Sequence, residues 1–171
     1  SVMEGHNSWV RAVAITPNGQ FAVSGSDDDT LRLWELPTGK CIRIMKGHTG
    51  TVNTVVLTPN GHFAVSGSQD KTLRLWDVSS GRCLRVFEGH TNRVNSVCLS
   101  SDGRWALSGS GKERDGWKDS TLHLWEVSTG RCVRAFEQHS WVKSVWLSSD
   151  GRWILSGGGP PSLWEASTGR C

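Results

Sequence analysis

The chain has no long hydrophobic segment. None of its apolar runs approaches the roughly 20 residues that a membrane-spanning helix requires, and its first residues lack the apolar core of a signal peptide. Neither charge predominates strongly, because 19 basic and 16 acidic side chains leave a net charge of +3. That excess is too small to indicate nucleic acid or an anionic membrane by itself. We therefore expect a soluble, cytoplasmic protein that makes no membrane contact.

The sequence also contains no Cys-x-x-Cys pair, so the usual spacing of a zinc site is absent. One cysteine, Cys98, lies in a predicted first strand; the other four recur at one position of a repeat, as Cys41, Cys83, Cys132 and Cys171. Equivalent positions of neighbouring repeats lie beyond the roughly 7 Å that a disulfide tolerates. We expect five free thiols, no metal and no cofactor.

One motif occurs four times along the chain. Leu73-Arg74-Leu75-Trp76-Asp77 has near copies at 31–35, 122–126 and 163–165, each ending in Trp followed by an acid. A pair ending in His precedes each copy, at Gly5-His6, Gly47-His48, Gly89-His90 and Gln138-His139. Residues 6–47 align with 48–89 without a gap, and 23 of the 42 positions are identical. Self-similarity at this period indicates a repeat architecture.

This Gly-His to Trp-Asp pattern resembles the WD40-repeat β-propeller family over essentially the whole chain. The resemblance implies blades of four-stranded antiparallel sheet around a central channel. Short β-branched and apolar runs also alternate with turn sequences such as Pro17-Asn18-Gly19, which favours antiparallel meanders. We expect an all-β fold in one domain, 1–171, with blades at about 6–46, 48–88, 90–137 and 139–171.

The two ends of the sequence match one another. The fourth repeat stops before a fourth strand, whereas residues 1–4 align with 43–46, the end of such a strand. Four blades closing a ring alone would each turn about 90°, while two chains placed head to tail give eight blades at about 45°. We expect a C2 homodimer in which residues 1–4 of one chain complete the fourth blade of the other. The alternative is a piece of a longer propeller.

Each repeat carries His, Ser and Trp at near-fixed spacing, and the first three also carry Asp. The resemblance implies a hydrogen-bonded tetrad in which Asp holds His, His contacts Ser, and Ser contacts the Trp indole. The sets are His6, Ser24, Asp28 and Trp34; His48, Ser66, Asp70 and Trp76; His90, Ser108, Asp119 and Trp125; and His139, Ser156 and Trp164. Burying such groups unpaired costs about 1–3 kcal/mol each, so we expect a structural role, with the fourth blade the least stable.

Asp, His and Ser are also the components of a hydrolase triad. Their threefold repetition, the mid-strand position of the Ser and the lack of a Gly-x-Ser-x-Gly elbow argue against that chemistry. We assign no catalytic residue, and a serine hydrolase is the least favoured alternative.

In the family that the sequence resembles, partners bind the face carrying the His-containing loops. The resemblance places the contacts three and five residues after His and just before the turn Asp. The matching positions are Trp9, Arg11 and Asp27; Thr51, Asn53 and Gln69; and Arg93, Asn95 and Lys118. In the fourth repeat, where the loop is one residue shorter, alignment places Trp141 and Lys143 there. The third repeat has seven additional residues around 111–117, expected to form an exposed extension that adds Lys112, Arg114 and Trp117. Trp105, Trp146 and Trp153 lie in predicted strands and are expected in the core.

Three functions follow from these residues. A non-enzymatic scaffold that binds a protein or peptide is the leading one, since Trp and Arg dominate interface energetics. Nucleic-acid binding through the basic and Trp side chains of the same loops is the alternative, and steep salt dependence would identify it. The hydrolase requires one uniquely reactive serine.

Overall fold

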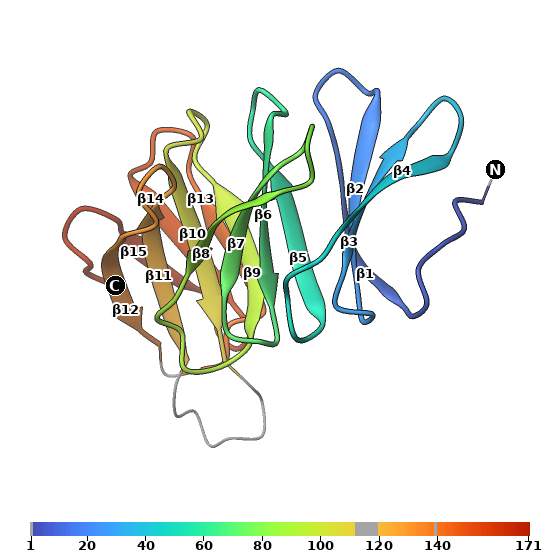
Figure 1. Ribbon diagram of the computed structural model, residues 1–171. Coiled ribbons are helices and arrows are strands. Elements are labelled where there is room, and N and C mark those ends of the chain that lie inside the picture. The colour runs from blue at the N-terminus through green and yellow to red at the C-terminus, as the bar shows by residue number, and fades with distance from the viewer. Residues whose placement is uncertain (1, 112–119, 139) are drawn as a thin grey trace.

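The structure is a computed structural model that describes residues 2–111, 120–138 and 140–171. The described residues form 15 strands in four antiparallel sheets (Figure 1), so the predicted all-β fold is confirmed. Sheet 1 contains β1 (Val10–Ile15), β2 (Phe21–Ser26), β3 (Leu31–Glu35) and β4 (Lys40–Met45); sheet 2 contains β5 (Val52–Leu57), β6 (Phe63–Ser68), β7 (Leu73–Asp77) and β8 (Cys83–Phe87). Sheet 3 contains β9 (Val94–Leu99), β10 (Trp105–Ser110), β11 (Thr121–Glu126) and β12 (Cys132–Glu137); sheet 4 contains β13 (Ser144–Leu147), β14 (Trp153–Gly157) and β15 (Ser162–Glu165).

Every sheet is a meander in which consecutive strands pair. Tight turns join the first two strands, as at residues 16–20, where the Thr16 hydroxyl donates to the Phe21 carbonyl and Gly19 adopts a φ of 67°. That conformation is strained for any residue with a side chain, which explains the glycine. The loops and turns lie at the two ends of the strands. At one end, called the His face, are the loops at 5–9, 47–51 and 89–93. At the opposite end, called the far edge, are the turns between the first two and between the last two strands of each sheet.

The four sheets stand side by side in chain order, and the two termini lie at opposite ends of the row (Figure 1). The core fills the seams between neighbouring sheets. At the first seam, Val23, Leu31 and Met45 of sheet 1 are fully buried together with Val52 and Trp76 of sheet 2. Equivalent clusters fill the second and third seams. The hydrophobic effect therefore joins the repeats through flat apolar sheet faces.

A glycine in each second strand permits this close packing. A Cβ atom built on Gly25 would lie 2.6 Å from a methyl carbon of Val52, and one on Gly67 would lie 2.5 Å from a methyl carbon of Val94. Gly109 stands against Val142 in the same way at the third seam. Gly157, the equivalent residue of sheet 4, has only the Ser144 hydroxyl of its own sheet nearby.

Sheet 4 has three strands, and its outward face is open. Trp146 and Trp153, expected in the core, are 66% and 39% exposed, so that prediction is wrong for both residues. The reason is that no sheet in the described part of the chain packs on the outward face of the fourth. Trp105, which does have a neighbouring sheet, is partly buried in the third seam.

Other sequence-based expectations concern the thiols and the chain ends. All five cysteines are free, and burial raises the pKa of the Cys98 thiol to about 12. Residues 2–4 form no strand, while Ser1 and the extension at 112–119 lie outside the described residues. No helix among the described residues has the length and hydrophobicity needed to cross a membrane.

Candidate binding face and the hydrogen-bonded tetrads

The first two sheets each contain a complete chain of polar contacts. In sheet 2, Nδ1 of His48 lies 2.7 Å from the Asp70 carboxylate, and Nε2 lies 2.7 Å from the Ser66 hydroxyl. The Trp76 indole N–H donates to the same hydroxyl at 2.8 Å. The carboxylate fixes the tautomer with hydrogen on Nδ1, so Ser66 donates to His48 and accepts from Trp76.

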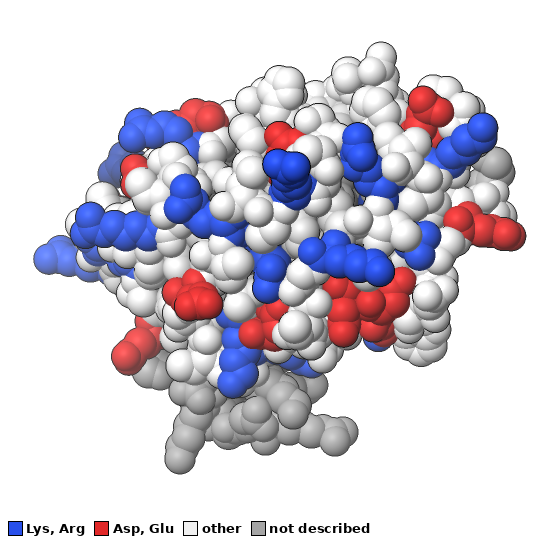
Figure 2. Space-filling model, in the orientation of Figure 1, with Lys and Arg blue, Asp and Glu red and all other residues white. Residues whose placement is uncertain are grey.

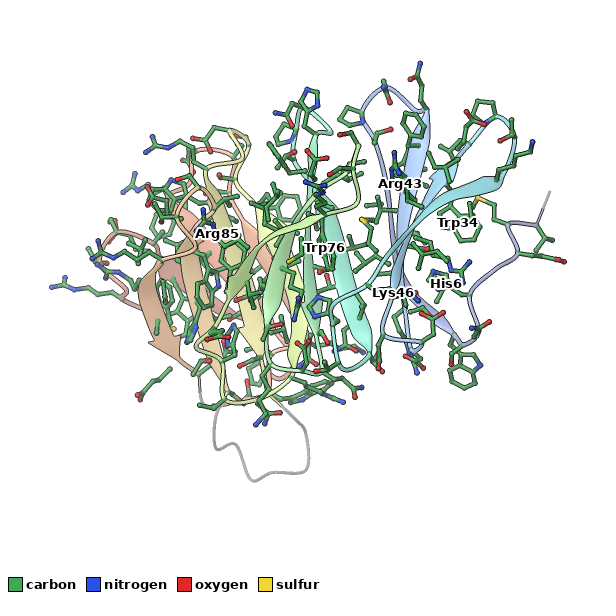
Figure 3. The ribbon with its side chains drawn as sticks, viewed as in Figure 1. His6, Trp34, Arg43, Lys46, Trp76 and Arg85 are labelled. Atoms are coloured by element: carbon green, nitrogen blue, oxygen red, sulfur yellow. The ribbon has the colours of Figure 1, made fainter. Side chains whose placement is uncertain are left out.

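Sheet 1 repeats this geometry. His6 lies 2.8 Å from the Asp28 carboxylate and 2.7 Å from the Ser24 hydroxyl, and the Trp34 indole donates to Ser24 at 2.7 Å. Figure 3 shows His6 beside Trp34 within the first sheet, with ring centroids 6.0 Å apart. Asp28 also accepts from the backbone N–H of Asn7, so it holds the His-containing loop against the turn.

The carboxylates of Asp28 and Asp70 each accept several hydrogen bonds. Burial disfavours the ionised form of Asp70, but hydrogen bonds from His48 and Thr72 outweigh that effect and hold its pKa far below the usual range. The pKa of Asp28 is lowered in the same way, with burial opposed by bonds from Thr30, Asn7 and His6. Both side chains stay ionised at neutral pH, and each buried polar partner is satisfied.

Sheet 3 keeps the contacts among His, Ser and Trp but differs in the partner of the histidine Nδ1 atom. Nε2 of His90 contacts the Ser108 hydroxyl at 2.6 Å, which accepts from the Trp125 indole at 2.8 Å. Nδ1 of His90 lies 3.1 Å from the Thr121 hydroxyl, and Asp119 lies outside the described residues. The imidazole of His123 stacks on His90 with ring centroids 4.0 Å apart. Burial lowers the pKa of His90 to about 3 and that of His123 to about 4, so both rings are neutral.

Sheet 4 uses a residue that sequence reasoning missed. The Ser156 hydroxyl donates to the Gln138 side-chain oxygen at 2.6 Å and accepts from the Trp164 indole at 3.1 Å. His139 lies outside the described residues. Spacing could have identified Gln138, because it precedes its serine by 18 residues, as His6, His48 and His90 do.

The tetrad serines are closed to a substrate. Ser66 and Ser108 have no exposed surface and Ser24 has 4%. Each of these three hydroxyls is already bonded to an indole and an imidazole. A nucleophilic serine must reach the substrate's carbonyl carbon, so these hydroxyls are placed to hold the sheets together. Among the described residues, no group of three or more metal-ligating side chains gathers in one place.

Trp9 is a prominent side chain on the His face and is 73% exposed. The Arg11 guanidinium lies over its ring at 5.1 Å and also bonds to both oxygens of Asp27, at 2.6 and 2.5 Å. This ion pair raises the pKa of Arg11 and lowers that of Asp27. The three residues come from one loop, one strand and one turn, so the sheet holds an aromatic ring and a charge pair in fixed positions.

The two asparagines predicted to bind partners are used inside the molecule. The Asn53 side chain donates to the Val94 carbonyl at 2.8 Å, across the second seam. Asn95 donates to the Gly111 carbonyl beside its own sheet at 2.8 Å and, across the third seam, to the Val142 carbonyl at 2.7 Å. Both amides brace neighbouring sheets, which reduces what they can offer a partner.

The remaining predicted contacts fall into three groups. Gln69 and Lys143 are exposed, and the Lys143 ammonium lies 6.0 Å from the centre of the Trp141 ring. Thr51 and Arg93 are partly buried, and Nε of Arg93 has no partner among the described residues. Trp117 and Lys118, together with Lys112 and Arg114, lie outside the described residues.

Four similar sheets, packed through apolar faces and fastened internally by an indole, a hydroxyl and either an imidazole or, in sheet 4, a glutamine side chain, define a propeller-type repeat protein. A family model described as "WD domain, G-beta repeat" matches residues 1–35, 39–77, 81–126 and 130–159. The chain therefore belongs to the WD40 repeat family.

Curated relatives match over a short stretch. Proteins named "Ribosome biogenesis protein BOP1 homolog" from Drosophila willistoni, Drosophila erecta and Drosophila melanogaster are 52% identical over 42 residues, which is 25% of this chain and 5% of each relative. That length equals one repeat period, so the similarity concerns the repeat unit.

Proposed function

We propose that the chain is a non-enzymatic scaffold that binds a protein or peptide on its His face. The observation that carries this proposal is the exposed Trp9 ring, which lies beside the Arg11 guanidinium. A salt bridge to Asp27 in turn holds Arg11 in place. An exposed Trp next to a fixed Arg has the composition of an interface hot spot. Because the ring and the charge pair are held before a partner arrives, little side-chain entropy remains to be lost on binding.

Quantitative capture from an extract of the native cell tests this proposal. The Trp9→Ala, Arg11→Ala double variant should lose the captured protein, while Arg104→Ala should retain it. Arg104 is a matched control because it stacks on Trp105 at 5.6 Å, but at the far edge. Equal capture by all three chains would contradict the proposal. Loss of capture after nuclease treatment, with steep salt dependence, would favour nucleic acid as the ligand.

We further propose that two chains close an eight-bladed ring. The first sheet exposes Val10, Val13 and Ile15 by 49%, 67% and 61%. In sheet 2 the residues matching the first two, Val52 and Val55, are 0% and 5% exposed because they pack into the first seam. The open face of sheet 1 is thus built like the faces that pair inside the molecule.

The open face of sheet 4 has the complementary surface. Leu155 and Leu163 are 45% and 54% exposed, whereas their counterparts Val65 and Leu75 are 0% and 7% exposed. Gly157 presents the gap that Gly25 and its equivalents use to receive a valine. A partner's Val10 would fill that gap, and residues 1–4 would then supply the missing strand of sheet 4. A second copy of this chain therefore matches both open faces through one repeated contact.

Light scattering after size-exclusion chromatography tests the ring. The wild type should have twice the 18.8 kDa chain mass. Gly157→Ala should weaken the dimer by at least about tenfold, because the added methyl group meets the incoming valine. Gly159→Ala is the control, since its Cβ would have a similar 3.1 Å contact within its own chain. A folded wild-type monomer at micromolar concentration would exclude the dimer.

A further inference from the structure

The far edge carries one cleft at each seam. The clefts have volumes of about 520, 530 and 420 Å³ at the first, second and third seams. All three combine an aromatic residue of a second strand with an arginine of a fourth strand, namely Phe21 with Arg43, Phe63 with Arg85 and Trp105 with Arg134. They lie away from the His face, so the proposed scaffold function does not account for them.

Arg43 is fixed at the first cleft by a single bond. Its Nε donates to the Ser79 carbonyl of sheet 2 at 2.6 Å. No described residue accepts a hydrogen bond from its two terminal nitrogens, and the side chain is exposed. Figure 3 shows Arg43 at the seam between sheets 1 and 2, closer to the far edge than His6 and Lys46 are. A guanidinium anchored through Nε keeps the paired donors that bind a carboxylate.

Apart from Arg43, the first cleft combines an apolar floor with polar turn residues such as Thr16, Asn18 and Asn60. Phe21, Leu33, Ile42 and Val78 line it, and Ile42 is 44% exposed. No carboxylate lines it within the described part of the chain. Lys and Arg side chains are spread over the face of the molecule on which β4 and β8 lie, with Asp and Glu side chains between them (Figure 2).

The other two clefts are different. Asp102 and Glu126 line the second, and Asp102 and Asp150 line the third. Near the first cleft, the Asp77 carboxylate accepts bonds from its own turn, from the Ser80 backbone at 2.6 Å and from the Ser79 hydroxyl at 2.7 Å. Of these three clefts, the first therefore combines an apolar floor and an arginine with no carboxylate among its described lining residues.

We propose that the cleft between sheets 1 and 2 binds a linear peptide segment in which an aliphatic side chain is followed by an acidic residue. The aliphatic side chain packs on Phe21 and Ile42, and the carboxylate receives the two terminal N–H groups of Arg43. This site is separate from the His face, so a partner could occupy both.

Titration with a defined peptide, followed by amide chemical shifts in NMR spectra, tests the site. The probe is a short capped peptide with two leucines followed by two glutamates, flanked by glycine and serine. It should shift the amides of residues 16, 18, 42, 43 and 60–62, which line the first cleft. Arg43→Gln should weaken binding at least about tenfold, because it removes a charge-assisted pair of bonds. The peptide with glutamine in place of glutamate should weaken to the same degree on the wild-type chain.

Two variants control for indirect effects. Arg85→Gln makes the same substitution at the second seam and should leave the affinity unchanged. Ile42→Asp puts a carboxylate at the cleft from an exposed position and should abolish binding while the chain stays folded. Equal affinity of the wild type and Arg43→Gln, shifts confined to the His face, or no shift at millimolar peptide would overturn the proposal.

Discussion

Replacing Ser66 with alanine isolates the contribution of one tetrad. The hydroxyl has no exposed surface, donates to Nε2 of His48 and accepts from the Trp76 indole. Removing it leaves a buried donor and a buried acceptor without partners, at about 1–3 kcal/mol each. Loss of the hydroxyl's own desolvation cost offsets part of this. We expect unfolding free energy to fall by about 3 kcal/mol, which for a chain of this size lowers Tm by about 6–12 °C.

Urea and thermal unfolding, followed by circular dichroism and Trp fluorescence, measure this effect. Ser149→Ala is the matched control, because Ser149 is exposed and its substitution should change stability by less than about 0.5 kcal/mol. A Ser66→Ala chain as stable as the control would refute the view that these contacts hold the sheet together. Retained labelling by a serine-directed covalent probe in the wild type, lost in Ser66→Ala, would instead support the hydrolase.

Three further predictions concern the other seams and sheets. Burial lowers the pKa of His90 to about 3 and that of His123 to about 4, against 6.5 in the unfolded chain, so the unfolded state takes up protons first as the pH falls. The free energy of unfolding, measured by urea titration, should therefore fall by about 3 kcal/mol from pH 7 to pH 5. The fall should be smaller in His123→Phe. Gln138→Ala should lower stability by about 1–2 kcal/mol in the same assay, because it removes the acceptor of a buried hydroxyl. Asn95→Ala should lower the stability of the chain more than Asn53→Ala does, because it removes two hydrogen bonds to backbone carbonyls and Asn53→Ala removes one. The opposite order in thermal unfolding would contradict the bracing role of these amides.

The strands could be read from the sequence because each repeat presents the same local signals. Turn glycines, β-branched runs and the Trp-acid ending all recur at one period, and local propensity agrees with the sheet at nearly every strand. The hydrogen bonds of His6 and His48 lie within single sheets, so they follow from the repeat alone.

Contacts between sheets could not be read in this way. In the sequence, Asn53 stands five residues after His48 at a predicted partner-contact position, and only the packing of sheet 3 against sheet 2 gives it the Val94 carbonyl as a partner. Trp146 has the alternation of a buried strand residue, yet its exposure depends on what lies beyond the last sheet. Residue type favours His139 at the tetrad position of sheet 4, whereas the 18-residue spacing to Ser156 favours Gln138.

The bracing amides also limit where a partner can bind. The position five residues after the first tetrad residue is asparagine in sheets 2 and 3, where it reaches the next sheet. At the ends of the row it is Arg11 and Lys143, each beside a Trp. In the proposed ring, sheet 4 of one chain adjoins sheet 1 of the other, which brings these two aromatic and cationic pairs to one seam. The binding face would then be shared between chains, so Gly157→Ala, which weakens the ring, should lose the same partner as Trp9→Ala. Retained capture by a monomeric Gly157→Ala chain would show that one chain suffices.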